Sequence, residues 1–232
     1  MTRSGITGNA VGRRPVPDAI VFDFDGLVVD TEWVEYVSID AVFREHGTQL
    51  SEDLWRSFIG TVDHPHWTEI LEQQVGRSLD REQLRHERVE ANRHVIESLP
   101  VQAGVGELMD EARSARIPMA IASSSPRHWV EGHLRRVGLW EYLDAVATGD
   151  EVERTKPDPA VYRLAVDRLG IDGPGVVALE DSVTGCHAAI GAGLSVVAVP
   201  SRMTTGMDFS HAHLVVQSVG ELDLGRLAGL AP

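Results

Sequence analysis

Cysteine and lysine are nearly absent from this sequence of 232 residues. Cys186 is its only cysteine, so the chain cannot form a disulfide within itself. Lys156 is its only lysine, because every other one of the 21 basic residues is an arginine. These absences exclude a disulfide-stabilised scaffold and make the position of the single lysine informative.

Long hydrophobic runs and an excess of positive charge are also missing. No apolar segment reaches the length of a membrane span or a signal peptide, and the first 18 residues are mostly polar. The 35 acidic residues outnumber the 21 basic ones, and the net charge of −14 would repel nucleic acid and anionic membranes. We therefore expect a cytoplasmic protein, a monomer or weak dimer, with a flexible extension over residues 1–18 and neither nucleic acid nor membrane as a partner.

Short apolar runs rich in β-branched residues predict buried strands. The chain is 43% hydrophobic, which is enough for a substantial core. The runs lie at residues 19–22, 118–122, 176–179, 196–199 and, more weakly, 214–216. Helical patterns occupy residues 105–115, 127–137 and 160–169. This alternation predicts an α/β fold with a Rossmann-like parallel sheet.

One region interrupts the alternation of strands and helices. Residues 33–98 contain no strand-like run, and they show helical patterns at 34–43, 54–59, 67–75 and 81–99. Proline and glycine near residue 100 end this region. We therefore predict a core domain formed by residues 19–30 and 100–232, with a small all-helical cap domain inserted at residues 31–99.

Acidic side chains follow two of the predicted strands. Asp23 and Asp25 come directly after the first strand, and Glu180 and Asp181 follow the strand at residues 176–179. Because loops converge at the carboxyl edge of a parallel sheet, these carboxylates are expected to meet if the two strands are neighbours. Two carboxylates about 4 Å apart repel by roughly 4 kcal/mol at an effective dielectric of about 20. Oxygen ligands of this kind favour Mg²⁺.

A hydroxyl and the single lysine occur at comparable places. Ser123 directly follows the strand predicted at residues 118–122, where the N–H groups of the following helix can bind phosphate. Lys156 lies between Thr155 and Pro157 in a proline-framed segment, so its direction is constrained. By itself each feature is more often a helix cap or a solvated surface residue. An ammonium beside a carboxylate nucleophile would suit phosphate chemistry.

The segments "DFDGLVVDTE", "ASSS", "KPDP" and "EDSVTG", in this order, resemble the four motifs of the haloacid dehalogenase superfamily. The resemblance extends from residue 19 to about residue 200 and is closest to the branch of β-phosphoglucomutases and sugar-phosphate phosphatases with a helical cap. It implies a nucleophile at Asp23, a general acid/base at Asp25, a phosphate-binding hydroxyl at Ser123 and a charge-stabilising Lys156.

The resemblance also implies the metal and substrate contacts. Metal ligands would be Asp23, Asp25 through its backbone carbonyl, Asp181 and Glu180. We place substrate contacts at Gly26 and Ser124 in the core and at Thr31, where the cap begins. Candidates in the cap are Glu35, Asp63, His64, His66 and Trp67.

The function implied is that of a Mg²⁺-dependent phosphatase acting on a small phosphorylated metabolite, such as a sugar phosphate, through an aspartyl-phosphate. Two alternatives are a sugar-phosphate mutase and a non-catalytic metabolite-binding protein. Mutases of this branch carry a histidine and an arginine where this chain has Glu35 and Asp63. Because acidic residues there would repel a bisphosphate, the sequence favours hydrolysis.

Overall fold

The computed structural model describes residues 16–59, 64–171 and 173–230 and contains a six-stranded sheet. Its strands are β1 (Ala19–Phe22), β2 (Met119–Ala122), β3 (Ala145–Ala147), β4 (Val176–Glu180), β5 (Ser195–Ala198) and β6 (Leu214–Val215). All neighbours pair in parallel, in the order β3-β2-β1-β4-β5-β6. The predicted α/β fold class with a Rossmann-like parallel sheet is confirmed.

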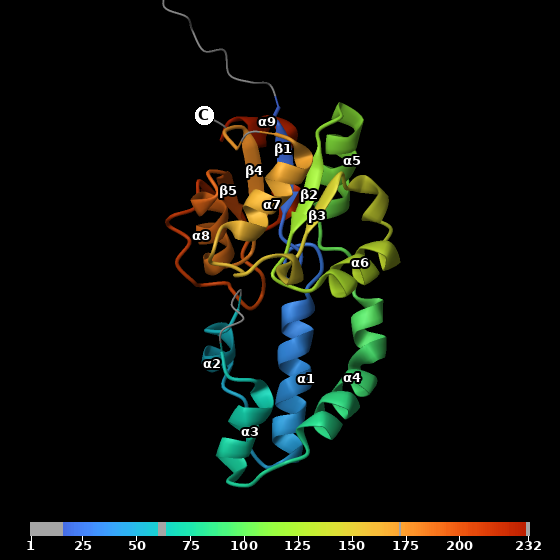
Figure 1. Ribbon diagram of the computed structural model, residues 1–232, viewed down its shortest axis with the longest axis vertical. Helices are drawn as coiled ribbons and strands as arrows, with labels where there is room; N and C mark the ends of the chain where they lie inside the picture. Colours follow the sequence, from blue (N-terminus) through green and yellow to red (C-terminus); the bar gives the residue numbers. More distant parts are fainter. Residues whose placement is uncertain (1–15, 60–63, 172, 231–232) are drawn as a thin grey trace, which may run out of the picture.

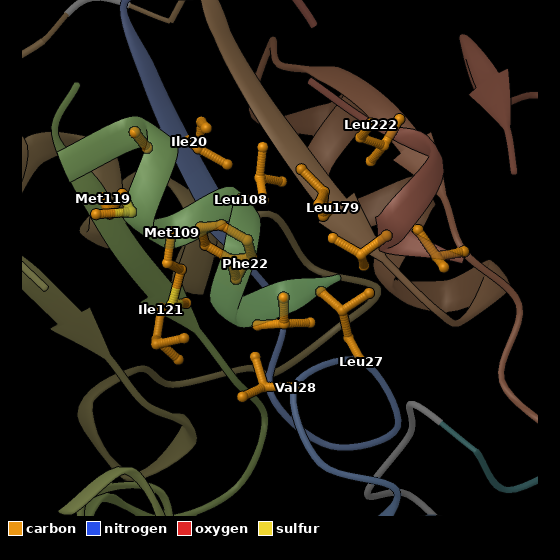
Figure 2. Close-up of a cluster of buried hydrophobic side chains, with 14 of the residues drawn as sticks. Ile20, Phe22, Leu27, Val28, Leu108, Met109, Met119, Ile121, Leu179 and Leu222 are labelled. Carbon is orange, nitrogen blue, oxygen red and sulfur yellow. The ribbon is translucent and has the colours of Figure 1, made fainter. Parts of the chain in front are cut away.

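Helices cover both faces of the sheet. One layer contains α5 (Val105–Ala115), α6 (Arg127–Arg136) and α9 (Leu224–Ala228), and the other contains α7 (Ala160–Leu169) and α8 (Val183–Gly191). Side chains alternate along each strand, so Phe22 and Ile121 face the first layer whereas Val21 and Ala120 face the second. Figure 2 shows the larger side chains packed against α5.

Four helices form a separate group beyond the carboxyl ends of the strands (Figure 1). They are α1 (Thr31–Glu45), α2 (Glu52–Arg56), α3 (Trp67–Val75) and α4 (Arg81–Ser98). Their own core includes Phe43, Trp55, Trp67 and Leu71, whereas α4 has no buried residue. The group therefore has the helical composition expected for the cap, and the domain boundaries at residues 31 and 99 stay a prediction.

Several expected elements differ from those in the structure. The helix expected at residues 54–59 begins at Glu52 and ends at Arg56. The strand expected at residues 214–216 is a two-residue edge strand that is not buried on both faces. The sequence did not predict β3, α8 or α9. Residues 1–15 of the expected extension lie outside the described residues. Among the described residues, no helix is long and apolar enough to cross a membrane.

Candidate active site

Three neighbouring strands bring the predicted site residues to one edge of the sheet. Because β1 lies between β2 and β4, the residues that follow these strands converge. They line a cavity of about 120 Å³, which we call the reaction cavity. Residues of the core that line it are Asp23, Asp25, Ser123, Ser124, Ser125, Lys156, Asp181 and Ser182. Glu32 of α1 and Ile59, which follows α2, complete the lining.

Lys156 is buried beside Asp23. Its ammonium donates hydrogen bonds to Asp23 Oδ1 and, over 2.6 Å, to Glu180 Oε1. Burial raises the pKa of Asp23 to about 8, although the positive charge of Lys156 opposes this shift. Burial alone would lower the pKa of Lys156, but the two carboxylates outweigh it and hold that pKa above its usual value. The lysine therefore remains charged next to the predicted nucleophile.

Asp25 is fixed by hydroxyl and indole donors. Its Oδ1 accepts hydrogen bonds from Thr31 Oγ1 at 2.7 Å and from Trp129 Nε1 at 2.9 Å. Its Oδ2 accepts from Ser125 Oγ at 2.6 Å and more weakly from Ser123 Oγ at 3.4 Å. These contacts hold the carboxylate at the wall of the reaction cavity. In this arrangement Thr31, expected to contact substrate, contacts Asp25.

The acidic cluster fits a divalent cation. Asp23, Glu180 and Asp181 are buried, and one carboxylate oxygen of each lies within 4.8 Å of the others. Asp181 Oδ2 is buried without a hydrogen-bond partner among the described residues. Burial, followed by the charge of Asp23, raises the pKa of Asp181 well above its usual value. A hard cation would supply the missing partner and offset the repulsion.

Glu180 differs from the other two carboxylates because its oxygens are already engaged. Oε1 accepts hydrogen bonds from Lys156 Nζ and from Tyr162 Oη, and Oε2 accepts from the backbone N–H and hydroxyl of Ser182. A Cβ added to Gly185 would lie 1.9 Å from Oε1. The Glu180 carboxylate therefore fits against α8 only because residue 185 is a glycine. Asp23 and Asp181 therefore offer freer oxygens to a cation than Glu180 does.

The predicted substrate contacts occupy different places. Ser124 lines the reaction cavity, and its buried hydroxyl has no hydrogen-bond partner among the described residues, which suits a phosphate oxygen. Gly26 lies so close to Asp181 that an added Cβ would be 2.2 Å from Asp181 Oδ2. Glu35 lines a second cavity in the cap together with His64, His66 and Trp67. Asp63 lies outside the described residues.

Sequence reasoning missed four residues that contact the site. Ser125 and Trp129 donate to Asp25, Tyr162 donates to Glu180, and Glu32 lines both cavities. Glu32 directly follows Thr31, and burial raises its pKa well above the usual value. Ser125 and Glu32 lie within the quoted segments "ASSS" and "DFDGLVVDTE", so a signal was available for them, whereas no motif marked Trp129 or Tyr162.

Comparison with known proteins gives a consistent family assignment. A family described as "Haloacid dehalogenase-like hydrolase" matches residues 20–199. The YhcW protein of Bacillus subtilis, which is named as a phosphatase, is 37% identical over 209 residues, covering 90% of this chain and 95% of the relative. The "Phosphorylated carbohydrates phosphatase" of Thermotoga maritima is 36% identical over 181 residues, covering 76% and 82%.

A solved structure agrees with this assignment. A Thermotoga maritima protein described as a beta-phosphoglucomutase superposes with a TM-score of 0.73 at 30% sequence identity. The match covers 88% of this chain and 95% of that protein. The similarity thus includes the helical group as well as most of the sheet.

Proposed function

The chain belongs to the haloacid dehalogenase-like hydrolase family and is a phosphatase, and we propose that it is a Mg²⁺-dependent phosphatase of small phosphorylated metabolites. The substrate would be a sugar phosphate or a similar phosphomonoester, as the name of the Thermotoga maritima phosphatase suggests. The observation that carries the proposal is the buried Asp23 beside Lys156, in a cavity that Asp25 and Ser124 also line, where the Ser124 hydroxyl has no hydrogen-bond partner within the described ranges.

The first proposed step transfers the phosphoryl group to Asp23. A carboxylate oxygen of Asp23 forms a bond to phosphorus while the bond from phosphorus to the leaving oxygen breaks. Asp25 gives its proton to that oxygen, which leaves as an alcohol. Lys156 and the hydroxyls of Ser123 and Ser124 stabilise negative charge on the phosphoryl oxygens. The products are the alcohol and an aspartyl-phosphate.

The second step restores the enzyme by hydrolysis. Water forms a new bond to phosphorus, its proton passes to Asp25, and the bond between phosphorus and Asp23 breaks. Inorganic phosphate leaves, Asp23 is again a carboxylate, and Asp25 is again protonated. Asp23, Asp181 and the backbone carbonyl of Asp25 are the groups that would hold Mg²⁺, with a contribution from Glu180 at one side. A bound Mg²⁺ would supply positive charge that offsets the repulsion between carboxylates and phosphate.

Phosphate release tests this proposal. Phosphorylated sugars, nucleotides and small acids are assayed with Mg²⁺ and then with excess chelator, and we expect metal-dependent release from a narrow subset. Asp23→Asn should lower kcat at least about 1,000-fold because the nucleophile is lost, with unchanged circular dichroism. The exposed Asp53 on α2 provides a control, since Asp53→Asn removes the same charge. An Asp23→Asn enzyme with a tenth of normal activity would refute the assignment.

A sugar-phosphate mutase remains the second candidate because of the solved structure described as a beta-phosphoglucomutase. A mutase would interconvert a sugar 1-phosphate and 6-phosphate, and phosphorus NMR would detect the new ester without free phosphate. The non-catalytic alternative has less support, since Asp23, Asp25, Lys156 and Asp181 all line one cavity.

A further inference from the structure

The two oxygens of the Asp25 carboxylate lie in different surroundings. Oδ2 accepts hydrogen bonds from Ser123 and Ser125, and both serines line the reaction cavity. Oδ1 accepts from Thr31 at 2.7 Å and from Trp129 at 2.9 Å, and neither donor is among the described residues that line this cavity. These contacts place Oδ2 on the cavity side of the carboxylate and Oδ1 on the side of the surrounding protein.

Trp129 differs chemically from the hydroxyl donors. A serine or threonine hydroxyl can donate or accept a hydrogen bond, and it can turn when its partner gains or loses a proton. The indole N–H of Trp129 can only donate. While this bond is in place, Oδ1 of Asp25 is held as an acceptor. Oδ2, whose neighbours are hydroxyls, is then the oxygen that can carry a proton beside the cavity.

Neighbouring residues hold the Trp129 ring in place. The ring meets that of His133, one turn further along α6, edge to face with 4.4 Å between the centroids. His133 is buried, and its Nδ1 accepts a hydrogen bond from Arg136 Nη2 at 3.3 Å. Arg136 also donates to the backbone oxygens of Leu99, at 2.7 Å, and Glu97, at 3.1 Å, where α4 ends. These contacts fix the direction of the indole N–H.

From these contacts we propose that Trp129 is a positioning residue for the proton transfers of Asp25. By holding Oδ1, its indole N–H keeps Oδ2 directed at the oxygen that leaves phosphorus. The inference rests on the proposed phosphatase reaction. In its first step the proton on Oδ2 passes to the leaving oxygen, while the bond from that oxygen to phosphorus breaks and the bond from phosphorus to Asp23 forms. Without the N–H, the carboxyl group can rotate about its Cβ–Cγ bond and donates in the productive direction less often.

The test compares two leaving groups. Benzyl phosphate must release a strongly basic alkoxide unless its leaving oxygen is protonated, whereas p-nitrophenyl phosphate releases a weakly basic phenolate that needs little help from an acid. Values of kcat/KM are measured for both esters with Mg²⁺, because they report the steps up to loss of the leaving group and not the later hydrolysis. We expect Trp129→Phe, which keeps a ring against His133, to lower the ratio of kcat/KM for benzyl phosphate to that for p-nitrophenyl phosphate at least about tenfold.

Trp140→Phe is the matched control, because Trp140 is also half-buried and is not among the described residues that line the reaction cavity. It should leave the ratio between the two esters unchanged.

A second measurement needs no catalysis. The five tryptophans should give five indole N–H signals in a proton–nitrogen NMR spectrum. Asp25→Asn replaces a charged acceptor with a neutral one, so the proton signal of one indole should move upfield more than the other four. That signal should be the one missing from Trp129→Phe. The exposed Asp53 on α2 supplies the control, since Asp53→Asn should leave this signal in place.

Two results would overturn the inference. The first is a folded Trp129→Phe enzyme with the same ratio between the two esters as Trp140→Phe, even if both esters react more slowly. The second is an Asp25→Asn spectrum in which no indole signal moves, a result that does not require Trp129→Phe to fold. Failure of the proposed function looks different, because the wild type would then release phosphate from neither ester. Turnover of both esters by the wild type with an unchanged ratio in Trp129→Phe contradicts the role of Trp129 alone.

Discussion

The chain turns at Gly26, just after Asp25, with a φ of 87°, a backbone conformation that residues with a Cβ rarely adopt. A Cβ built on it would lie 2.2 Å from Asp181 Oδ2, the buried oxygen without a partner among the described residues. The absence of a side chain therefore lets the loop after β1 and the end of β4 approach each other. This approach brings Asp181 to the same cavity as Asp23.

Replacing Gly26 with alanine should displace Asp181. We expect Gly26→Ala to lower phosphatase activity by more than about 100-fold and to weaken Mg²⁺ binding, measured by phosphate release and by titration calorimetry. Gly47 offers a matched control, since its φ is 77° and a Cβ there meets nothing within 4 Å. Gly47→Ala should cost about 1 kcal/mol of stability with activity intact. Equal activities of the two variants would contradict this account.

Sequence reasoning identified those site residues that follow a strand or belong to a motif. Asp23 and Ser123 directly follow apolar runs, and neighbouring strands bring their side chains together whatever the loops do. Tyr162 and Trp129 could not be found in this way. Each reaches the site from a helix, and which helical residue points inward depends on how the helix packs against the sheet.

At the scale of elements, Glu151 connects α7 to the segment after β3. Its carboxylate accepts hydrogen bonds from Arg168 Nη2 at 2.8 Å and from Thr148 Oγ1 at 2.7 Å, and Arg168 also donates to the backbone oxygen of Val146. The Arg168 hydrogen bonds lower the pKa of Glu151 to about 2 from an ordinary 4.5. The network thereby holds the edge strand β3 against α7.

This network should make stability depend on pH. Because the pKa of Glu151 is lower in the folded state, its contribution is complete above pH 4.5 and is lost as the pH falls towards 2. At pH 7 we expect Glu151→Gln to reduce the free energy of unfolding by about 1 kcal/mol, since solvent screens the pair. In urea titrations the difference from wild type should shrink below pH 4.5.

Glu153 supplies the control for this prediction, because it is exposed and forms no ion pair among the described residues. The Glu153→Gln variant should have the same stability as the wild type within about 0.5 kcal/mol at each pH. A deficit in Glu151→Gln that is constant from pH 7 to pH 3 would show that the carboxylate charge is not responsible.

Strands and helices could be predicted from the sequence where their residues and their length were typical of that type of element. The strand runs of β1 and β4 are rich in valine, isoleucine, leucine and phenylalanine, and a glycine follows the last residue of helix α7, so both signals were clear. Strand β3 has only three residues, and two of them are alanines with little strand preference. Helix α8 contains small residues and two glycines, which hide its periodicity. Tertiary packing determines such elements more than local preference does.

At the scale of the whole molecule, contacts between residues far apart in sequence hold the helical group against the segment that follows β5. Arg56 of α2 donates to the backbone oxygens of Arg202 and Thr205, and the Arg202 guanidinium lies over the Trp33 ring. Met203 is buried in the core of the helical group. Arg56 lies 149 and 146 residues before Thr205 and Arg202, so no local pattern in the sequence could have predicted these contacts.

The buried carboxyl groups of the site also affect the stability of the whole molecule. Asp23 and Asp181 both have raised pKa values because burial disfavours their charged forms. A cation that binds only the folded state adds about 2.7 kcal/mol at 100 times its Kd. Mg²⁺ should therefore raise Tm by about 5 to 10 °C for a chain of this size, measured by scanning calorimetry.

Asp181→Asn is the informative variant for this measurement, because it removes a predicted ligand with little change in shape. We expect it to lose most of the Mg²⁺-dependent rise in Tm, whereas Asp53→Asn on α2 should keep it. If Mg²⁺ stabilised all three proteins equally, the cation would bind elsewhere, and the metal site at the carboxyl edge of the sheet would be refuted.

The burial of Lys156 has a practical consequence for labelling. Its side-chain amine is the only one that the sequence contains, and the residue is 3% exposed. Amine-directed coupling chemistry, which usually decorates a protein surface at many lysines, therefore has a single lysine target here, and that target is inside the active site. Because acylation needs the neutral amine and the neighbouring carboxylates hold Lys156 charged, we expect this lysine to react far more slowly than an exposed one, and a dye attached to it should abolish phosphate release.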